Sequence, residues 1–75
     1  MNIHTSILVV DDEPMIRALV RRVLEKEYSS IVIVGSLQEG ISSINRQEFD
    51  LLLTDLRLPD GHGVELMCKF HEKFL

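Results

Sequence analysis

Short apolar runs divide the chain, and each is followed by a segment in which apolar residues recur at helical spacing. The predicted strands span Thr5–Val10, Ile31–Val34 and Leu51–Thr54. Because their apolar residues do not alternate with polar ones, these strands are typical of a parallel sheet that helices cover on both faces. The alternation of strands and helices predicts a βαβαβα chain of the α/β class.

Two of the predicted helices begin with recognisable start signals. Pro14 suits the first turn of a helix that runs to about Lys26, because no hydrogen bond is lost there. The apolar stripe of this helix leaves Arg17 on the side predicted to face water. Ser36 and Glu39 have the spacing of a capping box, in which the glutamate reaches back to the N–H of the capping residue.

The second and third helices carry features that predict how they pack. Gly40 lies inside the second helix, where it indicates close packing against the sheet. The third helix is predicted to start at Gly63 and to be apolar on two sides. One stripe contains Val64, Met67, His71 and Phe74, and the other contains Leu66 and Phe70. A helix of this kind is expected to need neighbours on both sides.

Composition limits the classes of function. The 75 residues are enough for one domain, predicted to span residues 1–75. The net charge of −4 argues against direct nucleic-acid binding by this segment. No apolar run approaches the roughly 18 residues of a membrane span. The single cysteine, Cys68, excludes an internal disulfide and is typical of a reducing cytosol, so a cytoplasmic location is expected.

Acidic residues directly follow two of the predicted strands. Asp11, Asp12 and Glu13 come after the first strand, and Asp55 comes after the third. Taken alone, each feature is more often a turn or helix-terminal charge than a functional site. If the two strands are parallel neighbours, however, the acids meet at the edge of the sheet where ligands bind in open α/β folds.

Clustered carboxylates favour a hard divalent cation. They repel one another unless a cation or protons are bound, and oxygen ligands favour Mg²⁺, Mn²⁺ or Ca²⁺ over zinc. Mg²⁺ also accepts water and phosphate oxygens, so the site could hold a phosphoryl group. Asp55 is the better candidate for a nucleophile that becomes an aspartyl phosphate. Asp11 and Asp12 are the better candidates for metal ligands.

Two motifs resemble the receiver domain of bacterial two-component response regulators. The first is the Val-Val-Asp-Asp-Glu-Pro segment at residues 9–14, and the second is the Asp-x-x-x-Pro-x-x-x-Gly pattern formed by Asp55, Pro59 and Gly63. The resemblance extends from Ile7 to about Phe74. It implies a flavodoxin-like, doubly wound parallel sheet, truncated to about three of the family's five βα units, with strand order 2-1-3.

The resemblance also implies a function. A histidine kinase or phosphotransfer protein would transfer a phosphoryl group to Asp55, with Mg²⁺ as the cofactor. The implied metal ligands are Asp11, Asp12, Asp55 and the backbone carbonyl of Arg57. Such a chain is a phosphoacceptor in a phosphorelay rather than an enzyme, and at most it removes its own phosphoryl group.

Two other functions fit part of the pattern. A Mg²⁺-dependent phosphatase would also use a strand-end aspartate, but many such enzymes carry Asp-x-Asp where this chain has the adjacent pair Asp11 and Asp12. The second alternative is a receiver fragment that is not phosphorylated and acts as a protein-binding or self-associating module. Its basis is the third strand, which is predicted to be an apolar sheet edge open to pairing with another chain.

Overall fold

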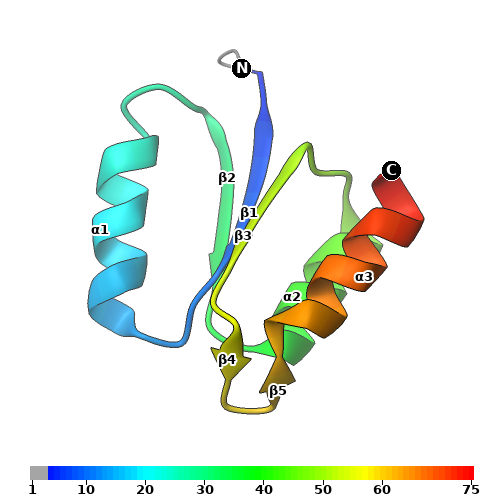
Figure 1. The fold of residues 1–75 in the computed structure, drawn as a ribbon. Helices are drawn as coiled ribbons and strands as arrows, with labels where there is room; N and C mark the ends of the chain where they lie inside the picture. Colours follow the sequence, from blue (N-terminus) through cyan, green and yellow to red (C-terminus); the bar gives the residue numbers. More distant parts are fainter. Residues whose placement is uncertain (1–3) are drawn as a thin grey trace.

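The computed structural model describes residues 4–75, which form a three-stranded parallel sheet with helices on both faces (Figure 1). Residues 1–3 of the predicted domain lie outside the described residues. The strands are β1 (Ser6–Val10), β2 (Ser30–Val34) and β3 (Leu51–Thr54), in the order β2-β1-β3. This confirms the predicted α/β, flavodoxin-like arrangement with strand order 2-1-3.

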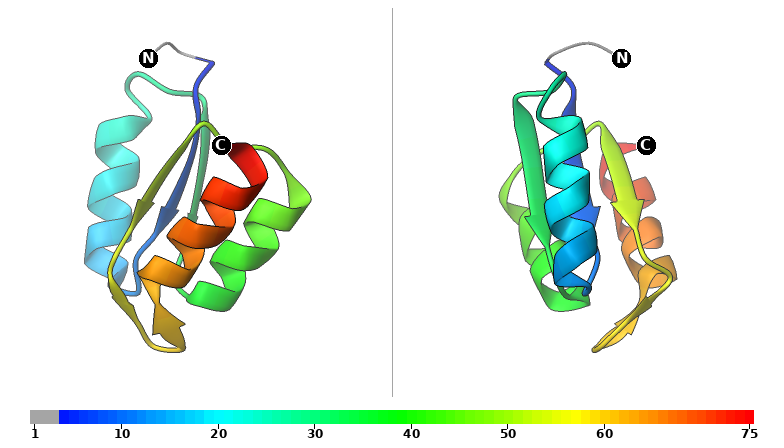
Figure 2. Two further views of the ribbon diagram at one scale, coloured as in Figure 1. Left: turned by 45° about the vertical axis from the view of Figure 1, so that its right-hand side comes forward. Right: turned by 90° about the vertical axis from the view of Figure 1, so that its left-hand side faces the viewer.

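The helices form two unequal layers. Helix α1 (Pro14–Leu24) covers one face of the sheet, while α2 (Leu37–Arg46) and α3 (Gly63–Phe74) lie side by side on the other (Figure 2). All three helices begin at the edge of the sheet where the strands end, which is the lower edge in Figure 1. Helix N-termini and strand C-termini therefore surround the same space.

The register of the sheet aligns the ends of the two strands that carry acids. Val10 in β1 is paired with Val34 in β2 and with Thr54 in β3. The pairing continues one residue further, because the Asp55 N–H donates to the Val10 carbonyl at 2.9 Å and the Asp11 N–H donates to the Val34 carbonyl at 3.1 Å. Asp11 and Asp55 are thus held at the same level of the sheet.

Most of the core lies between the sheet and the layer formed by α2 and α3. Its buried members are Leu8, Val10, Leu37, Ile44, Phe49, Leu58, Leu66 and Phe70. Gly40 in α2 allows the closest approach, since a Cβ atom there would lie 3.0 Å from a Leu66 methyl carbon and 3.1 Å from one of Val10. The predicted close packing at Gly40 is confirmed.

Helix α1 covers its face of the sheet less completely than α2 and α3 cover the other face. No residue of α1 is buried, and Leu19 and Val23 are each 57% exposed. On α3, the stripe with Leu66 and Phe70 packs into the core, whereas Val64 and Met67 of the other stripe stay at least half exposed. Phe74, at the end of that second stripe, is half-buried and packs against the core. The α3 helix therefore buries one apolar side fully and the other only at its C-terminal end.

Several local predictions need correction. Helix α1 ends at Leu24, not at Lys26. Ser36 caps α2 through its Oγ, which accepts from the Glu39 N–H at 3.2 Å, but the Glu39 carboxylate accepts from the N–H of Gly35 rather than from that of Ser36. The capping box is therefore shifted by one residue, because the glutamate side chain reaches past the capping residue.

A short hairpin after β3 was not predicted. It consists of β4 (Arg57–Leu58) and β5 (Gly61–His62), which pair antiparallel. Two-residue strands are too short to show a period of two, so the turn residues Pro59 and Gly61 indicated a loop. Leu58 is buried, and this burial anchors the hairpin to the core.

Leu66→Ala is expected to destabilise the fold strongly. Leu66 is fully buried against α2 and the sheet, and deleting such a side chain costs about 2–5 kcal/mol of unfolding free energy through lost burial and the cavity left behind. Urea denaturation followed by circular dichroism measures this. Leu19→Ala, at an exposed position of α1, is the matched control and should change stability far less. Equal losses in the two variants would contradict this description of the core.

Candidate functional site

The structure brings three of the predicted site residues together at the carboxyl ends of β1 and β3. Asp11, Asp12 and Asp55, named here the acidic cluster, each offer a carboxylate oxygen that lies within 4.8 Å of those of the other two. Asp11 is half-buried, while Asp12 and Asp55 are exposed. The convergence follows from the parallel pairing of β1 and β3, which ends both strands at one level.

The donor set of the acidic cluster fits Mg²⁺. Each Mg–O bond is about 2.0–2.1 Å, so two oxygens on opposite sides of the ion lie about 4.2 Å apart. Oxygens that are neighbours around the octahedral ion lie about 3 Å apart. The cluster's oxygens lie within 4.8 Å of one another, so rotation of the carboxylates must bring them closer to bind one ion. Water and phosphate oxygens are the usual companions of such carboxylates around Mg²⁺.

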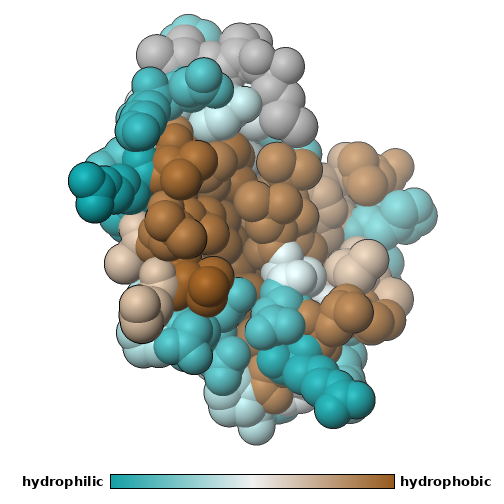
Figure 3. All heavy atoms as spheres, turned by 60° about the vertical axis from the view of Figure 1, so that its left-hand side comes forward, coloured by the Kyte–Doolittle hydropathy of each residue, from teal (hydrophilic) through white to brown (hydrophobic). Residues whose placement is uncertain are grey.

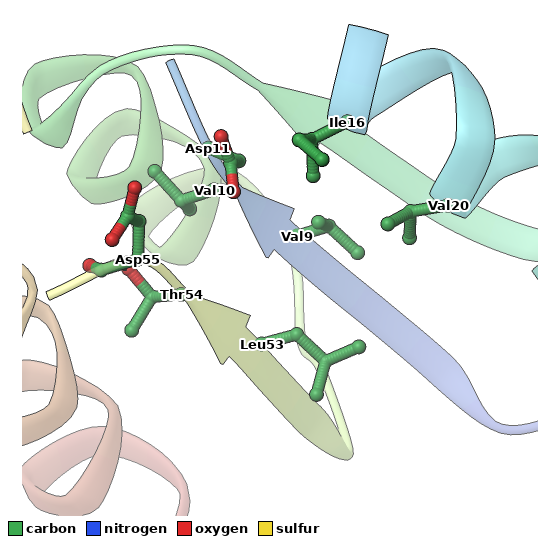
Figure 4. A pocket seen from close by; sticks show the side chains of 8 residues that line it. All are labelled: Val9, Val10, Asp11, Ile16, Val20, Leu53, Thr54 and Asp55. Atoms are coloured by element: carbon green, nitrogen blue, oxygen red, sulfur yellow. The ribbon is translucent and has the colours of Figure 1, made fainter. Parts of the chain in front are cut away.

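A surface pocket of about 260 Å³ adjoins the cluster (Figure 4). Asp11, Thr54 and Asp55 line its polar end at the strand termini. Apolar residues line the part between α1 and the sheet, and they are Val9, Val10, Ile16, Val20 and Leu53. The pocket therefore places an acidic site beside an apolar surface.

Hydrogen bonds hold the turn between β1 and α1. The Glu13 N–H donates to Asp11 Oδ1 at 2.9 Å, which fixes the orientation of that carboxylate. Arg17 Nη1 donates to the Asp11 backbone carbonyl at 2.9 Å. The prediction that Arg17 faces water is wrong, because its guanidinium folds back over the turn and its side chain is half-buried. Helical periodicity places Arg17 on the polar side but does not reveal a carbonyl within its reach.

The segment after Asp55 turns tightly, and this explains the glycine at the end of the motif. A Cβ atom on Gly63 would overlap the backbone carbonyl oxygen of Asp55. The Gly63 N–H donates to the Leu56 carbonyl at 2.9 Å, and Thr54 Oγ1 donates to the Asp55 carbonyl at 2.9 Å. Only glycine allows α3 to begin directly against the backbone of Asp55.

Asp60 has a role that sequence reasoning missed. It lies between β4 and β5, and its carboxylate accepts two hydrogen bonds from the N-terminus of α2. Oδ1 accepts from the Leu37 N–H at 2.8 Å, and Oδ2 accepts from the Gln38 N–H at 3.0 Å. These bonds from Gln38 and Leu37 hold the pKa of Asp60 below its ordinary value of 3.8. No local spacing signals this cap, since the partners are more than twenty residues apart.

Arg57, the remaining predicted ligand, lies in β4, two residues after Asp55. Arg57 is exposed to solvent. The assignment of its backbone carbonyl to a metal stays a prediction.

No helix formed by residues 4–75 combines the length and the hydropathy needed to span a membrane.

Comparison with known protein families identifies the chain. The model of the response regulator receiver domain matches residues 7–74, which include both strand-end acidic segments and the tight turn at Gly63. The chain therefore belongs to the response regulator receiver domain family, as the two motifs predicted.

Curated relatives agree with this assignment. The chain is 41% identical over 70 residues to the transcriptional regulatory protein ResD of Bacillus subtilis, covering 93% of this chain and 29% of ResD. It is 42% identical over 60 residues to the response regulator protein PilR of Pseudomonas aeruginosa, covering 80% of this chain and 14% of PilR.

A third relative shows the same relationship. The chain is 36% identical over 63 residues to the KDP operon transcriptional regulatory protein KdpE of Escherichia coli, covering 84% of this chain and 28% of KdpE. The chain thus spans less than a third of the length of each of these three relatives. A comparison with solved structures gave no significant match.

The stability that Asp60 contributes is expected to depend on pH. Its pKa is lower in the folded chain than its ordinary value of 3.8, so the ionised carboxylate stabilises the fold above that value. This contribution is lost as the pH falls through the lower folded-state pKa. We expect Asp60→Asn to be less stable than the unmodified chain at neutral pH, with the gap narrowing below pH 3.8.

Urea denaturation of both proteins at a series of pH values measures the gap. Glu72→Gln removes one exposed carboxylate from α3 and serves as the control for the loss of charge alone. A gap between Asp60→Asn and the unmodified chain that stayed constant down to the lowest pH would contradict the assignment of this stabilisation to the ionised Asp60.

Proposed function

We propose that this receiver chain accepts a phosphoryl group on Asp55 from a histidine kinase or phosphotransfer protein, with Mg²⁺ bound at the acidic cluster. The observation that carries the proposal is the convergence of three carboxylates from two adjacent strands within 4.8 Å. Membership of the receiver family supports it, because the domains of that family act as phosphoacceptors.

Asp55 is proposed as the nucleophile because its carboxylate lies at the end of β3, exposed and next to two further acids. One carboxylate oxygen would form the new bond to phosphorus while the bond from phosphorus to the donor histidine nitrogen breaks, and that nitrogen keeps the electron pair. The tight turn at Gly63 holds the Asp55 backbone during this step.

Asp11, Asp12, Asp55 and the backbone carbonyl of Arg57 are proposed to hold the metal. Mg²⁺ supplies positive charge that offsets the carboxylates and the oxygens of the transferring group. Asp11 is oriented by the Glu13 N–H, and its backbone is held by Arg17. These contacts pre-position the first strand end, so binding requires little further ordering of the chain.

The proposal defines the partners. The phosphoryl donor is a protein histidine, and no direct contact with nucleic acid or membrane is assigned to this segment. The chain is proposed to act in the cytoplasm as an acceptor, with self-dephosphorylation as its only turnover. Residues 1–75 are proposed to belong to one partial receiver domain.

Beryllofluoride, which mimics a phosphoryl group, is expected to bind the unmodified chain in the presence of Mg²⁺. Binding should shift the amide signals of residues 11, 12 and 55 in a two-dimensional NMR spectrum. Asp55→Asn should abolish these shifts, because it removes the anionic oxygen that bonds to beryllium.

Asp50→Asn is the matched control, since Asp50 lies at the opposite end of β3 and asparagine can still accept the hydrogen bond from the Ser6 N–H. It should preserve the response. An unmodified chain whose spectrum is unaffected by millimolar beryllofluoride and Mg²⁺ would refute the proposed phosphoryl acceptance.

A second candidate function, self-association through β3, is favoured by the apolar surface around this strand. In the described chain β3 is an edge of the sheet, and Leu53 is 41% exposed. A hydrophobic surface extends from α1 across this edge (Figure 3). On the other side of β3, Leu51, Leu52 and Met67 help to line an apolar pocket of about 440 Å³. Unpaired strand edges of this kind can pair with another chain.

Sedimentation velocity tests this second candidate. The chain is expected to form dimers as its concentration rises, and Leu53→Lys should weaken them, because a charge on an edge strand opposes pairing. Asn45→Lys adds the same charge at an exposed position of α2, on the opposite face of the sheet from α1, and should leave association intact. A folded chain that stays monomeric at high concentration would rule this candidate out.

A further inference from the structure

The hairpin at residues 57–62 connects the proposed phosphoacceptor to α3, and it has few hydrogen bonds of its own. Its strands contain two residue pairs, Arg57 with His62 and Leu58 with Gly61. An isolated two-stranded hairpin is marginal at best in water. Its orientation relative to the acidic cluster must therefore depend on contacts with the rest of the chain.

Contacts at both ends of the hairpin restrain it. At its base, the Gly63 N–H donates to the Leu56 carbonyl at 2.9 Å, and Gly63 lies against the Asp55 carbonyl. At its tip, Asp60 binds the N-terminus of α2. Between them, Leu58 is buried in the core. Asp60 supplies the polar side-chain contact that joins the tip to a different element of the fold.

The two hydrogen bonds of Asp60 fix the orientation of its carboxylate as well as its position. Each carboxylate oxygen accepts a separate backbone N–H, at 2.8 Å from Leu37 and 3.0 Å from Gln38. Two bonds to adjacent residues fix both the distance and the rotation of the carboxylate. Because the N-terminus of α2 carries partial positive charge, the contact also favours the ionised form. The N-terminus of α2 is in turn packed into the core through Leu37.

We propose that Asp60 is a positioning residue for the metal site: by fastening the hairpin tip to α2, it holds the β4 backbone at Arg57 where the carbonyl can complete the coordination that the acidic cluster begins. This role rests on the proposed function. Asp60 itself touches neither the metal nor the phosphoryl group. Residues that orient metal ligands without binding the metal commonly change its affinity about 10–100-fold when replaced.

The number of acceptor oxygens separates this role from a simple effect of charge. Asp60→Ala removes both acceptors and one negative charge. Asp60→Asn removes the same charge but keeps one oxygen that can accept from α2. Any loss of Mg²⁺ affinity caused by charge alone must therefore be equal in the two variants. A loss caused by the broken contact must be larger in Asp60→Ala.

The experiment is a Mg²⁺ titration of the full chain, followed by the NMR amide signals of residues 11, 12 and 55. We expect the dissociation constant to rise about 10-fold in Asp60→Ala and distinctly less in Asp60→Asn. Glu72→Gln, which removes an exposed carboxylate near the far end of α3, should match the unmodified chain. Only signals from folded protein enter the titration, so a variant with reduced stability still reports its affinity.

The outcomes distinguish the positioning role from the proposed function. Equal dissociation constants in Asp60→Ala and the unmodified chain would overturn the positioning role while leaving Mg²⁺ binding intact. Equal losses in Asp60→Ala and Asp60→Asn would also overturn it, because charge alone would then explain them. Failure of the unmodified chain to bind Mg²⁺ would overturn the proposed metal site itself, and the role of Asp60 with it.

Discussion

The parallel pairing of β1 with β3 is the interaction on which the site depends. It aligns Val10 with Thr54 and extends through the bond from the Asp55 N–H to the Val10 carbonyl. A shift of one residue would move every side chain of β3 to the other face of the sheet. It would also separate Asp55 from Asp11. Hydrogen bonds at both ends of β3 keep this register: the Asp50 N–H donates to the Ser6 carbonyl at 2.8 Å, and the Asp55 N–H donates to the Val10 carbonyl at 2.9 Å.

The site is built from contacts that reach beyond the strand ends. Arg17 closes the turn after β1, Gly63 allows α3 to start against Asp55, and Asp60 ties the following hairpin to α2. Each contact joins a flexible connection to an element that is already fixed by the core. Loops held in this way can present functional groups with little loss of entropy on binding. The packing of α2 and α3 on the sheet therefore supports the chemistry at its edge.

The two faces of the sheet differ in how completely they are covered. The layer of α2 and α3 contains nearly all the buried core, whereas α1 leaves Leu19 and Val23 largely exposed. Leu53 on β3 lies on the same poorly covered side, where it lines the pocket beside the acidic cluster. An apolar surface next to an acidic site is suited to contacts with another protein, which is consistent with the proposed transfer from a protein donor.

The sequence by itself determined the three strands of the parallel sheet, the three helices and the acidic cluster. Uninterrupted apolar runs marked the three strands, and Asp11, Asp12 and Asp55 were expected to meet because the ends of parallel strands share one edge. These features are local, or follow from one rule of topology. The tertiary structure alone decided the roles of Arg17 and Asp60, the shift of Glu39 to Gly35, and the hairpin at residues 57–62. Such contacts join residues whose proximity depends on how the layers pack, so no period or spacing along the chain could specify them.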